Sequence, residues 1–193
     1  GEGHVDEAEL ARIEGGGYQK TGAVLGTAGA DVPDFRRLGL GLVLCSDATV
    51  ADDGSVIGDP TEAALVVLAA KVGVDAEESR RSLPRRAEVP FDSDYKFMAT
   101  FHEVDLDGTK RLIQLVKGGP DVVLARCSEA GGPMSGAQVP IAQARADIDA
   151  ANAEMGAKGL RVLAFAARFV DESDRYLQPL PMLPTPPSTN AQH

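Results

Sequence analysis

The clearest hydrophobic pattern in the chain is an apolar run at residues 63–70 with helix signals on both sides. Asp59 can serve as the N-cap, Pro60 as the first helical residue and Glu62 as the third, which is a capping-box-like start. Gly73 follows the run and is a typical helix end. The pattern therefore predicts a helix between Asp59 and Gly73.

The middle of the chain changes to the partial alternation that is typical of strands. Residues 86–91 and 96–105 are rich in Val, Phe, Thr and Tyr, and both predict extended segments. Asp107-Gly108 is a favoured hairpin turn, after which residues 111–117 return as the partner strand.

Weaker patterns predict the other elements. Short strands are expected around Tyr18 and Val24-Leu25, a buried helix over residues 38–44, a turn at 52–54, helices over 120–126 and 139–158, and a last strand over 160–169. The strands come as a hairpin with helices grouped around them, without regular βαβ alternation. This order predicts an α+β fold, a mostly antiparallel β-sheet flanked by helices.

We expect one domain over residues 1–176, because a chain of 193 residues is long enough to bury its own core. Residues 177–193 are rich in proline and have no periodic apolar pattern, which predicts a disordered tail. No apolar run approaches the roughly 20 residues that cross a bilayer, and no signal-peptide pattern opens the sequence. We therefore expect a soluble, cytoplasmic, monomeric chain without direct membrane contact.

The charge pattern bears on possible partners. A formal net charge of −10 argues against nucleic acid, which requires a broad basic surface. One local basic stretch interrupts the acidic background, at Arg80, Arg81, Arg85, Arg86 and Lys96. It is interpreted either as a solvated face or as a region that attracts an anionic ligand.

Cysteine and histidine give no sign of a metal site. Cys45 and Cys127 lie far apart without metal-ligand spacing, so reduced thiols are expected. His4, His102 and His193 are scattered along the chain. Common catalytic and phosphate-binding motifs such as GxxxxGK[ST], HExxH and GxSxG are also missing from the sequence.

Four separated segments carry a resemblance to a known family. The segments are Gly58-Asp59-Pro60-Thr61-Glu62, Pro90-Phe91-Asp92-Ser93-Asp94-Tyr95-Lys96-Phe97-Met98, Lys117-Gly118-Gly119-Pro120-Asp121 and Gly159-Leu160-Arg161-Val162-Leu163. In their order and spacing they resemble the nucleotide-binding domain of P-type cation-transporting ATPases, most of all the type II branch that includes the calcium pumps. The match covers about residues 39–168, and Cys45-Ser46-Asp47-Ala48 ahead of the first segment also fits. The Ala/Gly/Arg-rich composition suggests a bacterial origin.

The resemblance gives two of these residues a role at the adenine base. By itself Glu62 reads as the third residue of a capping box, whereas the family places this glutamate at the adenine amino group. One carboxylate oxygen could serve each purpose. Phe91 could be a core aromatic, but its polar neighbours suggest a strand end with a partly exposed ring. The resemblance implies that adenine stacks on this ring.

Three positively charged residues are implied in phosphate or pocket contacts. Lys96 and Lys117 would ordinarily be surface charges, yet Lys117 shares strand parity with Ile113 and Leu115. The small residue Gly118 after it lets a ligand approach the backbone. Arg161 has the parity of an apolar strand face and so requires an anionic partner, either a carboxylate of the fold or a phosphate.

The resemblance also marks secondary ATP-binding positions and two departures. Ser93 stands where several calcium pumps have an arginine, and Lys-Gly-Gly-Pro-Asp replaces the usual Lys-Gly-Ala-Pro-Glu. Gln19 precedes Lys20-Thr21-Gly22, so the family's phosphorylated aspartate in Asp-Lys-Thr-Gly-Thr has no counterpart there. The secondary positions are Thr61, Ser93, Met98, Gly119 and Leu163.

The resemblance implies a domain that binds ATP and ADP and delivers the γ-phosphate to an aspartate in a separate phosphorylation domain. The partners would be the phosphorylation and actuator domains of a pump on the cytoplasmic side of the cell membrane. Mg²⁺ would accompany ATP, calcium is the leading cation, and no catalytic residue or metal site is assigned to this chain. Little turnover is expected of it alone. The alternatives are a regulatory nucleotide-binding protein and a protein-interaction module.

Overall fold

The fold was obtained as a computed structural model, which describes residues 11–13, 17–21, 24–26, 34–131 and 138–170. Its centre is an antiparallel four-stranded sheet with the strand order β10-β7-β6-β5. The strands are β5 (Arg85–Asp92), β6 (Phe97–Leu106), β7 (Thr109–Gly118) and β10 (Ala164–Val170). The α+β fold with an antiparallel sheet is thereby confirmed.

The hairpin of β6 and β7 positions the rest of the sheet. Its two-residue turn places Asp107 at φ 54° and Gly108 at φ 82°, between the paired residues Leu106 and Thr109. Positive φ at both central residues defines a type I′ turn, whose twist matches that of the flanking strands. The hairpin predicted from Asp107-Gly108 is confirmed.

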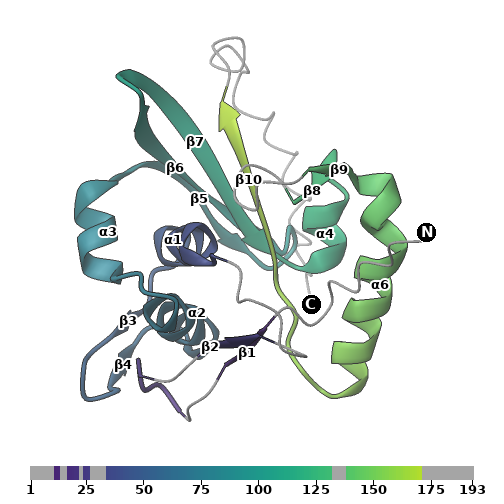
Figure 1. Ribbon diagram of the computed structural model, residues 1–193, viewed down its shortest axis with the longest axis horizontal. Helices are drawn as coiled ribbons and strands as arrows, with labels where there is room; N and C mark the ends of the chain where they lie inside the picture. Colours follow the sequence, from purple (N-terminus) through teal and green to yellow (C-terminus); the bar gives the residue numbers. More distant parts are fainter. Residues whose placement is uncertain (1–10, 14–16, 22–23, 27–33, 132–137, 171–193) are drawn as a thin grey trace, which may run out of the picture.

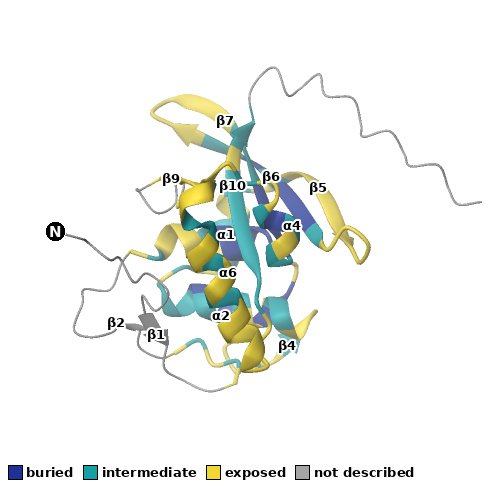
Figure 2. Ribbon diagram, turned by 90° about the vertical axis from the view of Figure 1, so that its right-hand side faces the viewer, coloured by how far each residue is buried: buried dark blue, intermediate teal, exposed yellow. Residues whose placement is uncertain are grey.

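Two groups of helices cover the sheet (Figure 1). The helices α1 (Arg36–Leu44), α2 (Pro60–Lys71) and α3 (Ala76–Ser82) lie on one side, and α4 (Pro120–Leu124) and α6 (Ile141–Ala157) lie on the other. No residue of α6 is buried, and Figure 2 shows this helix as largely exposed. None of the helices in the described part of the chain is long and apolar enough to span a membrane.

The core lies between the sheet and the first helix group. One cluster joins Val43, Leu44 and Cys45 at the end of α1 to Met98 and Leu115 of the sheet. A second cluster packs the apolar face of α2 against the short strand β3 (Thr49–Val50), with Ala48, Val50, Ala63, Val66 and Val67. The segment after α1 therefore connects both clusters, and its backbone is held close to the end of β7.

The remaining elements are short two-stranded pairs. They are β1 (Ala11–Ile13) with β2 (Val24–Gly26), β3 with β4 (Val56–Ile57), and β8 (Glu129–Ala130) with β9 (Val139–Pro140). The strand predicted at Val24-Leu25 is confirmed. The one predicted at Tyr18 is wrong, because Tyr18 lies in a turn and donates a hydrogen bond to the Pro60 carbonyl at 3.3 Å. The predicted tail at 177–193, His4 and His193 lie outside the described residues.

Candidate functional site

The site is built around the first turn of α2, whose start follows from the local sequence. The Asp59 carboxylate accepts hydrogen bonds from the backbone N–H groups of Thr61 at 2.8 Å and Glu62 at 3.1 Å. Pro60 occupies the first helical position, where no N–H is needed. The predicted cap is confirmed, and it fixes the direction in which Glu62 leaves the helix.

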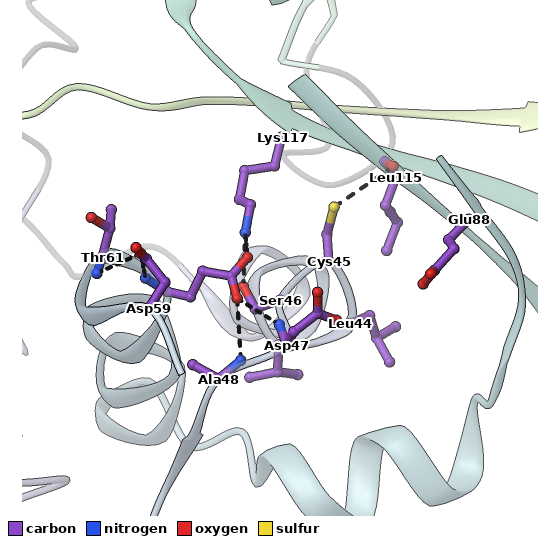
Figure 3. Close-up of polar contacts among 12 residues, drawn as sticks. Leu44, Cys45, Ser46, Asp47, Ala48, Asp59, Thr61, Glu88, Leu115 and Lys117 are labelled. Atoms are coloured by element: carbon purple, nitrogen blue, oxygen red, sulfur yellow. Dashed lines mark hydrogen bonds and ion pairs between the residues drawn. The ribbon is translucent and has the colours of Figure 1, made fainter. Parts of the chain in front are cut away.

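Glu62 connects three parts of the fold, and Figure 3 labels its partners Asp47, Ala48 and Lys117. Its Oε2 accepts from the backbone N–H groups of Asp47 at 2.8 Å and Ala48 at 3.2 Å. Its Oε1 forms an ion pair with the Lys117 ammonium. The capping-box interpretation is therefore wrong for this residue, because its oxygens face the segment after α1 and the end of β7, and Asp59 alone caps the helix.

Lys117 is a buried cation, with 6% of the residue exposed. It lies opposite Met98 of β6 and Phe165 of β10 in the sheet register, on the face that packs against the helices. Its ammonium also donates to the Ser46 hydroxyl at 3.4 Å. A buried charge is stable only when it is paired and hydrogen-bonded, and Lys117 satisfies both conditions.

Glycine is required at position 118 because the backbone at the start of β6 passes too close to leave room for a side chain. A Cβ atom at this position would collide with the Lys96 carbonyl oxygen and would lie 2.7 Å from the Phe97 Cβ, which is closer than real contacts allow. The N–H of Gly119 donates to the same carbonyl at 3.0 Å. The glycines therefore attach the loop after Lys117 to the turn that ends in Lys96.

Two predicted residues lie on that turn and a third lies just before it. The Asp92 carboxylate accepts from the N–H groups of Asp94 at 2.7 Å and Tyr95 at 3.1 Å, which sets the turn and leaves Ser93 and Lys96 exposed. Phe91, just before it in β5, is 62% exposed. The expectation of an exposed ring at a strand end is confirmed.

Arg161, which lies between α6 and β10, contacts the first turn of α2. Its Nη1 donates to the Thr61 hydroxyl at 3.2 Å. The strand predicted from residue 160 begins only at Ala164, because Gly118 is the last residue of β7 that can pair with it. Arg161 and Leu163 thus precede the strand, and the interpretation of Arg161 as part of an apolar strand face is wrong.

Some of the predicted residues come together in two side-chain contacts at the first turn of α2. Glu62 contacts Lys117, and Thr61 contacts Arg161. The backbone of Lys96 contacts Gly119, two residues after Lys117. Met98 is 3% exposed and belongs to the core, opposite Lys117 on the neighbouring strand.

Sequence reasoning missed the contribution of the segment after α1. Ser46, Asp47 and Ala48 supply the polar atoms that hold Lys117 and Glu62. The only signal for them was that Cys45-Ser46-Asp47-Ala48 fits the family pattern. These contacts join residues far apart in sequence, so no local pattern indicates them.

The five residues of the basic stretch fall into an exposed group and an inward-facing group, which the sequence does not indicate. Arg81, Arg86 and Lys96 are exposed, as expected of a solvated face. Arg80 and Arg85 turn inward and donate to backbone carbonyls at the end of α1, including that of Ser46. For these two arginines the solvated-face interpretation is wrong.

The described residues contain two free thiols and no metal-ligand cluster. Burial raises the pKa of the Cys45 and Cys127 thiols, and neither is paired in a disulfide. Across the described ranges no three His, Cys, Asp or Glu side chains gather in a way that could hold a metal ion.

Comparison with known proteins points to one family. Residues 34–188 match the family described as P-type ATPase, cytoplasmic domain N. The chain is 37% identical over 141 residues to calcium-transporting ATPase 1 of Lactococcus lactis, covering 72% of this chain and 15% of that protein. It is 39% identical over 131 residues to a calcium-transporting ATPase of Listeria monocytogenes, covering 67% and 14%. A cation-transporting ATPase of Synechocystis is 37% identical over 171 residues, covering 82% and 18%. The chain therefore spans less than a fifth of the length of these relatives.

Proposed function

The chain belongs to the family of P-type ATPase cytoplasmic N domains, and from this premise we propose that it binds ATP at the first turn of α2. The proposal rests on two side-chain contacts at this turn, Glu62 with Lys117 and Thr61 with Arg161, which bring residues from three separate segments to one helix end. Two cations, a carboxylate and a hydroxyl at one helix N-terminus offer suitable partners for an adenine nucleotide.

The contacts leave hydrogen-bonding capacity for a ligand. An ammonium has three donors, and Lys117 uses two of them, on Glu62 and Ser46. An ionised carboxylate has about four acceptor positions, and Glu62 uses three, on Lys117, Asp47 and Ala48. One donor and one acceptor position remain in the pair. In the proposal the acceptor serves the adenine amino group.

The remaining contacts would come from the exposed residues nearby. Adenine would stack on Phe91, an interaction worth about 1–3 kcal/mol where base–aromatic stacking has been measured. Lys96 and Arg161 would approach the phosphates, while Gly118, Gly119, Ser93 and Leu163 would shape the surroundings. Met98, the buried cross-strand neighbour of Lys117, would pack beside it. We expect a dissociation constant in the high micromolar to millimolar range, roughly −4 to −6 kcal/mol.

The finer functional claims concern the protein of which this domain is part. We propose that it is a bacterial calcium-transporting pump, in which this domain carries ATP to the aspartate of a phosphorylation domain on the cytoplasmic side of the membrane. The relatives named above are calcium- or cation-transporting ATPases, which supports this choice. Because the described residues offer no metal-ligand cluster, Mg²⁺ would arrive with ATP and be held by other domains.

The test is the affinity of this chain for ATP in wild type and in Phe91→Ala, measured by calorimetry. Loss of the stacking face should weaken binding about 5- to 150-fold. Leu106→Ala is the matched control. Leu106 is also an exposed apolar residue, but it is the last residue of β6, whereas Phe91 lies near the first residue of that strand. Equal affinities in wild type and both variants would remove Phe91 from the site, and no binding up to about 10 mM would contradict the proposal.

A further inference from the structure

A cavity of about 240 Å³ lies beside the segment that holds the Lys117–Glu62 pair. Ser46 and Asp47 belong to both places, since they contact that pair and also line the cavity. The other lining residues have no part in the proposed ATP site. The full lining is Leu44, Ser46, Asp47, Arg80, Leu83, Arg85 and His102.

One of the two arginines in the cavity wall is already neutralised. Arg85 Nη1 lies 2.8 Å from the Asp47 carboxylate and 2.5 Å from the Glu88 carboxylate. Its Nη2 donates to the carbonyls of Leu44 and Ser46, at 3.3 and 3.4 Å. Two carboxylates therefore balance this guanidinium, and the Asp47 carboxylate is directed to it.

Arg80, by contrast, forms no ion pair with a described carboxylate. Its Nε donates to the Val43 carbonyl at 3.1 Å, and its Nη2 donates to the carbonyls of Ser46 and Ala48 at 2.9 and 3.0 Å. Among the residues that the structure describes, no carboxylate lies within 4.0 Å of this guanidinium, and its Nη1 has no hydrogen-bond acceptor. Burial and the neighbouring Arg85 charge lower the pKa of Arg80. The carboxylates of Asp47, Glu62 and Glu77 act on Arg80 only from farther away, and they raise its pKa by less than burial and Arg85 lower it. A half-buried cation without a direct ion pair is unusual, because such charges are normally paired.

We propose that the cavity binds a small oxyanion such as inorganic phosphate, with the free Nη1 of Arg80 as its principal donor. The planar set of N–H donors on a guanidinium matches the spacing of phosphate oxygens, whereas the ammonium of a lysine acts as a point charge. Arg85 and its two carboxylates form a closed set of ion pairs, so Arg80 is the cation of the wall that is left to meet an anion.

The volume of the cavity favours a small ligand, and its histidine is engaged in hydrogen bonds within the protein. A volume of about 240 Å³ is below the roughly 300–1,000 Å³ of ordinary small-molecule pockets, which disfavours a whole nucleotide. It is several times the roughly 30 Å³ share of one water, so a tetrahedral anion has room. His102 is 1% exposed, and its ring nitrogens contact the Leu83 carbonyl at 2.8 Å and the Thr100 hydroxyl at 3.0 Å. The ring forms a wall and contributes no donor.

The experiment is a titration of the ¹⁵N-labelled chain with inorganic phosphate at constant ionic strength, with chloride as the reference. We expect saturable shifts at the amides of Leu44, Asp47, Leu83 and His102. Arg80→Gln should weaken binding at least about tenfold, as expected for the loss of a charged hydrogen-bond donor. Arg81→Gln is the matched control with the same change in net charge, because Arg81 is exposed and pairs with Glu78.

Several outcomes would overturn the proposal. They are shifts identical to those in chloride, unchanged binding in Arg80→Gln, or phosphate shifts confined to Phe91, Lys96 and Lys117. If Arg80→Gln does not fold, Arg80→Lys keeps the charge but loses the guanidinium donors, and it should bind phosphate more weakly than wild type. The readout does not depend on ATP binding, so failure here and failure at the ATP site can be told apart.

Discussion

The Lys117–Glu62 pair should be energetically coupled, and a double-mutant cycle measures this directly. Lys117→Met removes the cation and leaves the Glu62 carboxylate with a side chain that is only 16% exposed. Removing one partner of a buried pair typically costs 3–5 kcal/mol. Glu62 would keep its hydrogen bonds to the N–H groups of Asp47 and Ala48, so we expect a cost near the lower end, about 3 kcal/mol.

The complementary variant is Glu62→Gln. The amide oxygen still accepts a hydrogen bond from the segment after α1, but the Lys117 ammonium loses its counter-ion while 6% exposed. We expect a similar loss of about 3 kcal/mol. The double variant contains neither charge, so its loss should be smaller than the sum of the two by about 2 kcal/mol or more.

The assay is urea unfolding followed by circular dichroism, with the free energy of unfolding extrapolated to water. Thermal unfolding should agree, since about 1 kcal/mol corresponds to roughly 2–4 °C in a domain of this size. Additivity of the two single changes within about 0.5 kcal/mol would refute the reasoning, because it would mean that the charges do not interact in the folded state.

Three further predictions concern stability and are read in the same unfolding assay. Asp59→Ala should cost about 1 kcal/mol through loss of the α2 cap, whereas no loss would assign the helix start to Pro60 alone. Gly118→Ala should destabilise by more than about 2 kcal/mol because its Cβ would meet the Lys96 carbonyl, while Gly156→Ala in α6, where nothing lies within 4 Å, should stabilise by up to about 1 kcal/mol. Burial lowers the pKa of His102 below 6.5, so the unfolded chain takes up its proton first and stability should fall as pH drops from about 7 through 6.5. His102→Gln should flatten that slope, and an unchanged slope would assign the pH dependence to other groups.

Local features of the fold could be predicted because their physical causes lie within a few residues. The α2 start depends on Asp59 and Pro60, and the β6–β7 turn depends on Asp107 and Gly108. In both cases the residue that adopts the special backbone conformation or accepts the capping bonds is adjacent to the element it defines. Patterns of this kind need no knowledge of the tertiary structure.

The errors arise where distant segments decide the outcome. The start of β10 is set by its partner β7, which ends at Gly118, so the apolar pattern after residue 160 overestimated the strand. The role of Arg80 depends on carbonyls at the end of α1, which only tertiary packing brings near. Likewise, the Glu62 carboxylate contacts Asp47, Ala48 and Lys117 and not its own helix.

The site residues could be proposed from the sequence only through the family resemblance. Lys117 shows why, because strand parity correctly placed it with Ile113 and Leu115 but could not identify Glu62 as its counter-ion. The position of Phe91 on an exposed strand end was accessible from its polar neighbours. The contacts of Glu62 with Lys117 and of Thr61 with Arg161 arise only in the folded chain.

The most direct test of the central claim is a chemical-shift map of the ¹⁵N-labelled chain titrated with ATP. The proposal predicts saturable shifts clustered at Glu62, Phe91, Lys96, Lys117 and Arg161, with the far end of the β6–β7 hairpin unaffected. Phe91→Ala should reduce the shifts at the other four positions at the same ATP concentration. Shifts scattered over the surface, or none localised up to about 10 mM ATP, where even a millimolar site would be mostly filled, would contradict the claim that this chain binds ATP at α2.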